Sequence, residues 1–121
     1  MKQKDKLGQL GEEMAANFLL EKGYFIRDRN WRFDRKEIDI IAQKDKVLII
    51  VEVKTRKDDF IENPGEIVNK RKERFLVEAC DAYIREFELD FETRFDVIFI
   101  NFPGGNSKIN HVENAFYPTL I

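Results

Sequence analysis

The sequence predicts a single α/β domain in which helices flank a mixed central sheet. The predicted elements follow the order αβββαββ, and residues 1–121 contain no linker, repeat or low-complexity segment. Apolar residues make up 43% of the chain, which is enough for one packed core. The longest apolar run covers residues 47–51, far short of the ~20 residues of a membrane span.

The first half of the chain predicts one helix and three strands. Residues 7–22 form the helix, and Gly23 stands at the position that commonly ends one. Residues 24–33 and 37–43 are rich in aromatic and β-branched side chains, as strands are. Residues 47–54 are almost continuously apolar, which indicates a strand buried on both faces.

The second half predicts a helix and two further strands. Asn63 is the expected N-cap, Pro64 the first helical residue, and the helix runs to about residue 87. Strands follow at residues 94–102 and 108–117, and the turn between them contains two glycines.

The charge balance argues against a typical nucleic-acid-binding domain, which is usually basic. Lys and Arg number 21 and Asp and Glu 23, for a net charge of −2. The signs are unevenly distributed: residues 1–74 carry 18 basic and 15 acidic side chains, and the rest carry 3 and 8. A basic surface formed by the first part of the chain is therefore compatible with the acidic total.

The cysteine count and the N-terminus predict a soluble, reduced, cytoplasmic protein. Cys80 is the one cysteine, so no internal disulfide forms, and no Cys/His cluster suggests zinc. A nucleophilic pair of Cys80 with His111 lacks any local signature. The first residues contain no apolar segment of a secretory signal.

Two carboxylates occupy positions where the pattern predicts apolar residues. Glu52 lies near the end of the apolar strand, where a charge is costly unless it is paired, hydrated or bound to metal. A hairpin centred between Asp45 and Lys46 places Asp39 directly opposite Glu52, with Cβ atoms ~4.5–5.5 Å apart. Such carboxylates repel each other, and a divalent cation reverses that repulsion. Oxygen ligands at this spacing suit Mg²⁺ or Mn²⁺.

The same register brings a lysine beside the two carboxylates. Glu37 lies opposite Lys54, and alternation groups Glu37 with Asp39 and Ile41, on the face opposite Ile38. A cation at Lys54 can orient an attacking water or stabilise charge that develops on a phosphate. The alternative is a lysine at the strand end that simply reaches solvent.

Each predicted helix adds one candidate residue. Glu12 shares a helical stripe with Gly8, Gly11 and Ala15, whose small size predicts close approach to the sheet, so Glu12 is a candidate third carboxylate. Lys72 falls within the apolar stripe of the second helix. It either enters the site or extends out of the stripe to solvent.

Four further residues have two interpretations. Arg94 and Asp96 share a strand face, which predicts a structural ion pair, with a supporting role near the metal ligands as the alternative. Trp31 and Arg32 could contact nucleic acid by base stacking and phosphate binding. A core position for the tryptophan is the alternative.

Together these residues resemble the YraN-like family of small bacterial proteins, in the PD-(D/E)xK nuclease superfamily. Their order and spacing are also similar to archaeal Holliday-junction resolvases. One departure is Lys36, which stands where the family usually has glycine. The motifs that carry the resemblance are Gly8-x-x-Gly11-Glu12-x-x-Ala15, Arg29-Asn30-x-Arg32, Glu37-Ile38-Asp39-Ile40-Ile41-Ala42, Val51-Glu52-Val53-Lys54-Thr55-Arg56, Val68-x-x-x-Lys72 and Arg94-Phe95-Asp96.

The resemblance implies a restriction-endonuclease-like core and a set of site residues. Asp39 and Glu52, with the backbone carbonyl of Val53, would bind Mg²⁺ or Mn²⁺, and Lys54 would assist the attacking water. Glu12 would complete the acidic cluster, and Glu37 would lie next to the metal ligands without binding the metal itself. Residues expected to bind substrate phosphates are Arg29, Arg32, Arg56 and Lys72, together with the segment 27–36.

The expected function is hydrolysis of DNA phosphodiester bonds by a metal-dependent endonuclease, on branched or structured DNA. Junction cutting would favour a two-fold homodimer. The alternative is a non-catalytic module that keeps the nuclease fold and binds nucleic acid or a protein partner. The residues do not distinguish DNA from RNA.

Overall fold

The computed structural model describes residues 5–57, 69–102 and 106–116. In these residues, one five-stranded sheet carries two helices, in the predicted order αβββαββ. The elements are α1 (Lys6–Glu21), β1 (Phe25–Phe33), β2 (Lys36–Lys44), β3 (Val47–Arg56), α3 (Lys70–Glu86), β4 (Glu92–Asn101) and β5 (Lys108–Val112).

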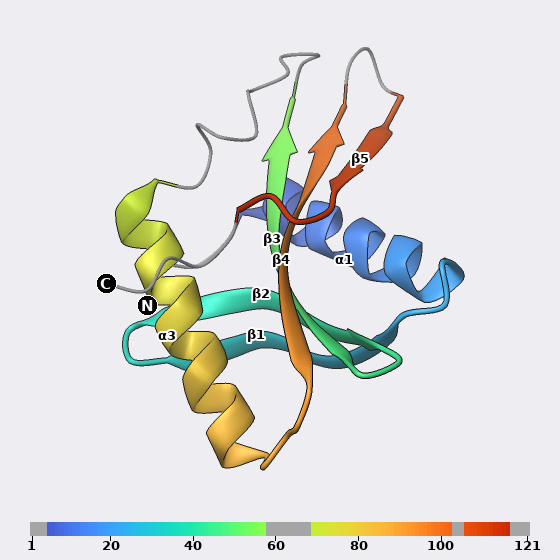
Figure 1. Ribbon diagram of the computed structural model, residues 1–121. Coiled ribbons are helices and arrows are strands. Elements are labelled where there is room, and N and C mark those ends of the chain that lie inside the picture. Colours follow the sequence, from blue (N-terminus) through green and yellow to red (C-terminus); the bar gives the residue numbers. More distant parts are fainter. Residues whose placement is uncertain (1–4, 58–68, 103–105, 117–121) are drawn as a thin grey trace.

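The sheet is mixed, as predicted, and its strands lie in chain order from β1 to β5. β1, β2 and β3 form an antiparallel meander, β4 and β5 form an antiparallel pair, and β3 and β4 run parallel. The parallel pair is joined through α3, while α1 lies on the opposite side of the sheet (Figure 1). This arrangement is the restriction-endonuclease-like fold.

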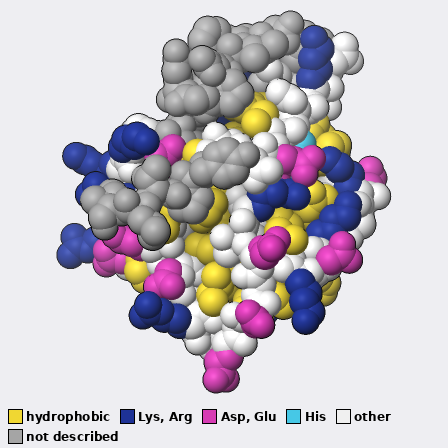
Figure 2. Space-filling model, viewed as in Figure 1, with side chains coloured by type: hydrophobic (Ala, Val, Ile, Leu, Met, Phe, Trp, Pro, Cys, Tyr) yellow, Lys and Arg dark blue, Asp and Glu magenta, His cyan; other side chains and the backbone are white. Residues whose placement is uncertain are grey.

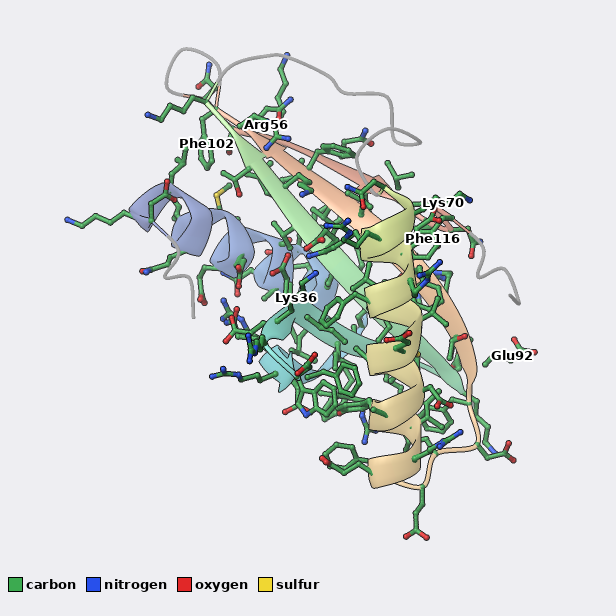
Figure 3. All side chains as sticks on the ribbon, turned by 90° about the vertical axis from the view of Figure 1, so that its left-hand side faces the viewer. Lys36, Arg56, Lys70, Glu92, Phe102 and Phe116 are labelled. Carbon is green, nitrogen blue, oxygen red and sulfur yellow. The ribbon has the colours of Figure 1, made fainter. Side chains whose placement is uncertain are left out.

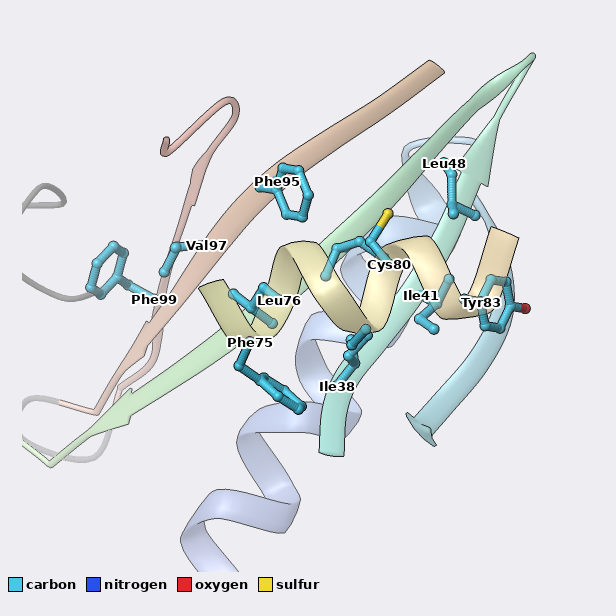
Figure 4. Close-up of a cluster of buried hydrophobic side chains, with 12 residues drawn as sticks. Ile38, Ile41, Leu48, Phe75, Leu76, Cys80, Tyr83, Phe95, Val97 and Phe99 are labelled. Carbon is cyan, nitrogen blue, oxygen red and sulfur yellow. The ribbon is translucent and has the colours of Figure 1, made fainter. Parts of the chain in front are cut away.

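Each face of the sheet has its own apolar core. Leu48 and Ile50 of β3 pack on the α3 side with Phe75, Leu76 and other buried side chains (Figure 4). Ile49 and Val51 pack on the α1 side, with Ala15 and Leu19 among others. The alternation confirms that β3 is buried on both faces.

The β2–β3 hairpin has the predicted register. Asp45 and Lys46 form its turn, and the paired residues run from Lys44 opposite Val47 to Ile40 opposite Val51. Asp45 has a φ of 55°, in the left-handed region that Asp and Asn tolerate. Past Ile40 and Val51 the pairing stops, and β2 and β3 diverge (Figure 1). Asp39 and Glu52 are the first residues beyond the last pair, so they lie where the two strands separate.

The opening changes the side-chain alternation along β2, where the sequence prediction was wrong. Ile38 packs in the same cluster as Ile41, on the α3 side, instead of on the opposite face. Asp39, which separates them, accepts a hydrogen bond from the Val53 backbone N–H at 2.8 Å. Once the ladder is open, its hydrogen bonds no longer hold the chain to strict alternation, and the Asp39 side chain reaches sideways to β3.

Among the described residues, the largest difference from the predicted element ends is at β5. α3 begins at Lys70, and its N-cap Asn69 accepts a hydrogen bond from the Lys72 backbone N–H at 2.9 Å. The expected cap, Asn63, lies outside the described residues. β5 ends at Val112 rather than near residue 117, because a turn with Asn114 at φ 52° follows. At the end of α1, Gly23 has the expected positive φ, 89°.

Candidate active site

A pocket of about 600 Å³ lies where β2 and β3 diverge. It reaches from the first turns of α1 to the first turn of α3, and Figure 3 looks into the space between these helices, with Lys36 and Arg56 labelled. Its charged lining residues are Asp5, Glu12, Arg35, Lys36, Glu37, Asp39, Glu52, Lys54, Arg56 and Lys72, joined by Leu7, Gly8, Val53 and Thr55.

Three of the lining carboxylates are buried, and all three were predicted site residues. Glu12, Asp39 and Glu52 are 4%, 7% and 5% exposed. Glu12 comes from α1, Asp39 from β2 and Glu52 from β3, so the pocket brings together three separate elements. Burial of so many carboxylates is costly unless cations or hydrogen-bond donors meet them.

The pKa of Glu52 is perturbed by its position in the pocket. Burial, together with the charge of the adjacent Asp39, raises its pKa to about 7, and Lys72 offsets part of this rise. Lys72 Nζ lies 3.0 Å from Glu52 Oε2. That contact is ionic without hydrogen-bond geometry, so among the residues described the buried Oε2 accepts no hydrogen bond. A buried acceptor in this condition is suited to a cation.

The donor atoms at this point fit a hard divalent cation. Asp39 and Glu52 interact directly, and Val53, with its backbone carbonyl, also lines the pocket. In the described part of the chain, no group of three His, Cys, Asp or Glu side chains is arranged to hold a metal ion. Mg²⁺ commonly binds one or two carboxylates and keeps several waters, which matches a pair better than a closed cage.

Basic side chains surround the rim of the pocket. Arg35 and Lys36 are exposed, whereas Lys54, Arg56 and Lys72 are half-buried. Lys54 forms no ion pair or hydrogen bond with another described residue, so its ammonium group remains available within the pocket. Lys36, the departure from the family pattern, has no left-handed backbone, so a lysine fits there without strain.

Two predicted phosphate-binding residues lie outside the pocket lining. Arg29 pairs with Glu13 of α1 at 2.8 Å, and Arg32 donates to the Asp34 carbonyl at 3.3 Å. The other two, Arg56 and Lys72, line the pocket, as does Glu37. From the segment 27–36, Arg35 and Lys36 reach the rim, because they belong to the β1–β2 turn and the start of β2.

Asp96 belongs to a separate polar cluster, away from the pocket. Arg94 donates to both of its carboxylate oxygens, at 2.9 and 2.8 Å, and His111 Nε2 lies 2.7 Å from Oδ2. The Asn114 backbone N–H donates to Oδ1 at 3.1 Å. Although burial alone would raise the pKa of Asp96, the His111 and Arg94 contacts lower it. The predicted structural ion pair is confirmed, and the contacts of Asp96 with His111 and Asn114 tie β4 to the chain around β5.

For Trp31 and Cys80, the structure favours the structural interpretation over the functional one. Trp31 packs edge-on against Tyr83, with ring centres 5.1 Å apart, and lies partly buried against the core on the α3 side. Cys80 is buried on α3, and burial raises the pKa of its thiol to about 12, which makes it unreactive at neutral pH.

Thr55, which was not predicted, explains how Glu12 is held at the pocket. A Cβ built on Gly11 would overlap Thr55 Oγ1, so α1 approaches β3 closely only because residue 11 is glycine. The stripe of small residues on the helix was the sequence signal for this contact.

Gly11→Ala should therefore separate α1 from β3 and move the adjacent Glu12. We expect a loss of about 1–3 kcal/mol in the free energy of unfolding, the usual cost of overpacking. Urea unfolding of the double mutant Gly11→Ala/Thr55→Ala is the control, because removal of the Thr55 side-chain atoms should recover part of the loss. Strictly additive effects of the two substitutions would show that this contact does not set the approach.

The chain was compared with known proteins. Residues 11–100 match the model of the uncharacterised protein family UPF0102. A UPF0102 protein of Bacteroides thetaiotaomicron is 44% identical over the full length of both chains. A relative from Flavobacterium psychrophilum is also 44% identical, over 97% of this chain and 98% of its own, and one from Porphyromonas gingivalis is 41% identical, over 94% and 85%.

None of the helices in the described ranges is both long enough and apolar enough to cross a membrane. The family match covers most of the chain, and the relatives align with nearly all of it. The chain belongs to the UPF0102 family, the YraN-like family that its motifs resemble.

Proposed function

We propose that this protein is a metal-dependent endonuclease that hydrolyses phosphodiester bonds of DNA. The observation that carries the proposal is the arrangement of charge in one pocket. Buried carboxylates lie at its floor and five basic side chains lie around it. A nucleic-acid-binding module without catalysis would need the basic side chains but has no use for Asp39 packed against Glu52.

The floor of the pocket supports the metal-binding part of the proposal. Asp39 and Glu52 would hold Mg²⁺ or Mn²⁺, together with the Val53 carbonyl. A divalent cation bound there would polarise a phosphate and lower the pKa of water. Asp39 also accepts the Val53 N–H, which fixes the position of its carboxylate relative to β3.

The basic residues would act on the substrate and on water. Lys54 lies two residues after Glu52 in β3 and forms no ion pair with a described residue. Its ammonium group can therefore orient the attacking water or stabilise charge on the phosphate. Arg35, Lys36 and Arg56 would contact neighbouring phosphates of the strand. Such contacts weaken as salt rises.

The acidic total of the protein fits local rather than extended DNA binding. Acidic and basic side chains are interspersed on the face seen in Figure 2, with no broad area of one sign among the described residues. We therefore expect weak, salt-sensitive binding to unbranched duplex, with phosphate contacts concentrated at the pocket.

Cleavage assays test this function directly. Single-stranded, duplex, flap and four-way-junction DNA would be incubated with Mg²⁺ or Mn²⁺, and in parallel with a chelator. We expect metal-dependent cleavage that falls at least about 100-fold in each of Asp39→Asn, Glu52→Gln and Lys54→Met. These isosteric substitutions remove charge while keeping shape.

Lys46→Ala is the matched control for the lysine variant. Lys46 is exposed in the β2–β3 turn, at the far end of β3 from the pocket, so the same charge is lost away from the site. Its activity should equal that of the wild type. Cleavage that survives all three site substitutions would eliminate this mechanism. No cleavage of any DNA or RNA, together with no metal-induced rise in Tm, would favour the non-catalytic module.

A further inference from the structure

We propose that Lys72 is a tethered counter-ion for Glu52 that a divalent cation must displace, and that its displacement delivers the lysine to the substrate phosphate. The proposal rests on the proposed function, because it concerns the same pocket. In this proposal, α3 sets the metal affinity of the pocket through Lys72 and couples metal binding to substrate binding.

The geometry places one cation on the carboxylate already. Lys72 Nζ lies 3.0 Å from Glu52 Oε2, and the Glu52 side chain is only 6% exposed. Lys72 belongs to the first turn of α3, where its backbone N–H is held by the Asn69 cap at 2.9 Å. The base of the side chain is thus fixed while its long aliphatic stem remains free to turn.

A divalent cation and this ammonium group compete for the same small space. Mg²⁺ binds carboxylate oxygens at about 2.0–2.1 Å, so a metal held by Asp39 and Glu52 would lie close to an ammonium that stays 3.0 Å from Oε2. Like charges at such range inside a protein repel each other strongly. Metal binding therefore requires Lys72 to leave Glu52.

The lysine has a place to go on the rim. Its side chain is 31% exposed, and its ammonium lies 5.7 Å from the centre of the Phe75 ring. Lys36 approaches the same ring, at 5.5 Å. The ammonium thus already lies near this ring while it contacts Glu52. A small rotation away from Glu52 would leave it at the ring beside Lys36, where two ammonium groups could bind one phosphate strand. Metal binding and DNA binding would then strengthen each other.

The first measurement is the affinity for Mg²⁺ alone, by calorimetry at pH 8.5, above the pKa of Glu52 near 7. Lys72→Met should bind Mg²⁺ about tenfold more tightly than the wild type, since no cation opposes the metal. Lys70→Met is the matched control. Lys70 is largely exposed, lies in the same turn and pairs with Glu73, so its loss should leave the affinity unchanged.

The second measurement is the coupling between metal and DNA, in a Lys54→Met background that should not cleave. With Lys72 present, Mg²⁺ should tighten binding of junction DNA, whereas in Lys72→Met the metal should have a much smaller effect. Lys72→Gln serves as a second variant, and circular dichroism confirms that each protein is folded.

The outcomes separate this proposal from the proposed function. Mg²⁺ affinity that is equal or weaker in both folded Lys72 variants would overturn the role of Lys72 and leave the metal site intact. Failure of the wild type and of both variants to bind Mg²⁺ or Mn²⁺ would overturn the metal-dependent function itself, and the counter-ion proposal with it.

Discussion

Glu52→Gln is expected to stabilise the metal-free protein at pH 8 by roughly 2–3 kcal/mol. In the wild type, burial and the neighbouring Asp39 raise the pKa of Glu52 from 4.5 to about 7. The ionised carboxyl is therefore a source of instability at neutral and alkaline pH, which a neutral glutamine lacks. Lys72 loses its partner in the variant, but its partly exposed side chain can turn to solvent.

The pH dependence gives this prediction its sign. Because the pKa of Glu52 is raised on folding, the folded chain holds the proton more tightly, and the wild type loses stability as pH rises from about 4.5 to 7. Urea unfolding between pH 4.5 and 8.5 should show equal stabilities at the acid end and a growing advantage for Glu52→Gln. A difference that stays constant with pH would contradict the assignment.

Excess Mg²⁺ should reverse the order of the two proteins. A metal that binds only the native wild type raises its free energy of unfolding, by about 4.1 kcal/mol at one thousand times Kd, which exceeds the advantage of the variant. Glu52→Gln lacks one ligand and should gain much less. The substitution is thus expected to exchange function for stability at a single position.

Asp96→Ala is expected to cost about 3–5 kcal/mol, the usual penalty when one partner of a buried ion pair is removed. The Asp96 side chain is fully buried and receives hydrogen bonds or close contacts from Arg94, His111 and the Asn114 backbone. Among the residues that the structure describes, its removal would leave Arg94 with exposed Glu113 as its charged partner. Thermal and urea unfolding would measure the loss.

An exposed ion pair provides the control for this substitution. Asp81 and Arg85 pair at 3.2 Å on α3, with side chains 57% and 79% exposed. Asp81→Ala should change the free energy of unfolding by no more than about 0.5 kcal/mol. Similar costs at the two positions would show that burial does not set the strength of the Asp96 cluster.

The sequence was sufficient to predict the part of the site that depends on local geometry. A two-residue turn at Asp45 and Lys46 determines the register of β2 against β3, which holds as far as Ile40 and Val51. The predicted direct pairing of Asp39 with Glu52 is wrong, because the ladder ends one residue before them. The alternation of side chains along β3 then predicted which residues face each side of the sheet. Both arguments use residues a few positions apart, where sequence spacing and spatial spacing agree.

The rest of the site depends on contacts that no local pattern encodes. Arg29 is drawn away from the pocket by Glu13 on α1, and the alternation breaks at Asp39 because the hairpin opens there. His111 meets Asp96 only because β5 lies beside β4 in the sheet. Asn69, which caps α3, was not predicted from the sequence.

The strand order has a consequence for folding during synthesis. Every strand joins the sheet beside the strand made just before it, so no strand must be inserted between two others. The meander β1–β3 can form early, but the apolar edge of β3 stays open until β4 emerges. We expect a nascent chain that ends before β4 to bind chaperones or aggregate through this edge. Asp39 and Glu52 would also meet before Lys72 is synthesised, so Glu52 gains this counter-charge only when α3 packs on the sheet.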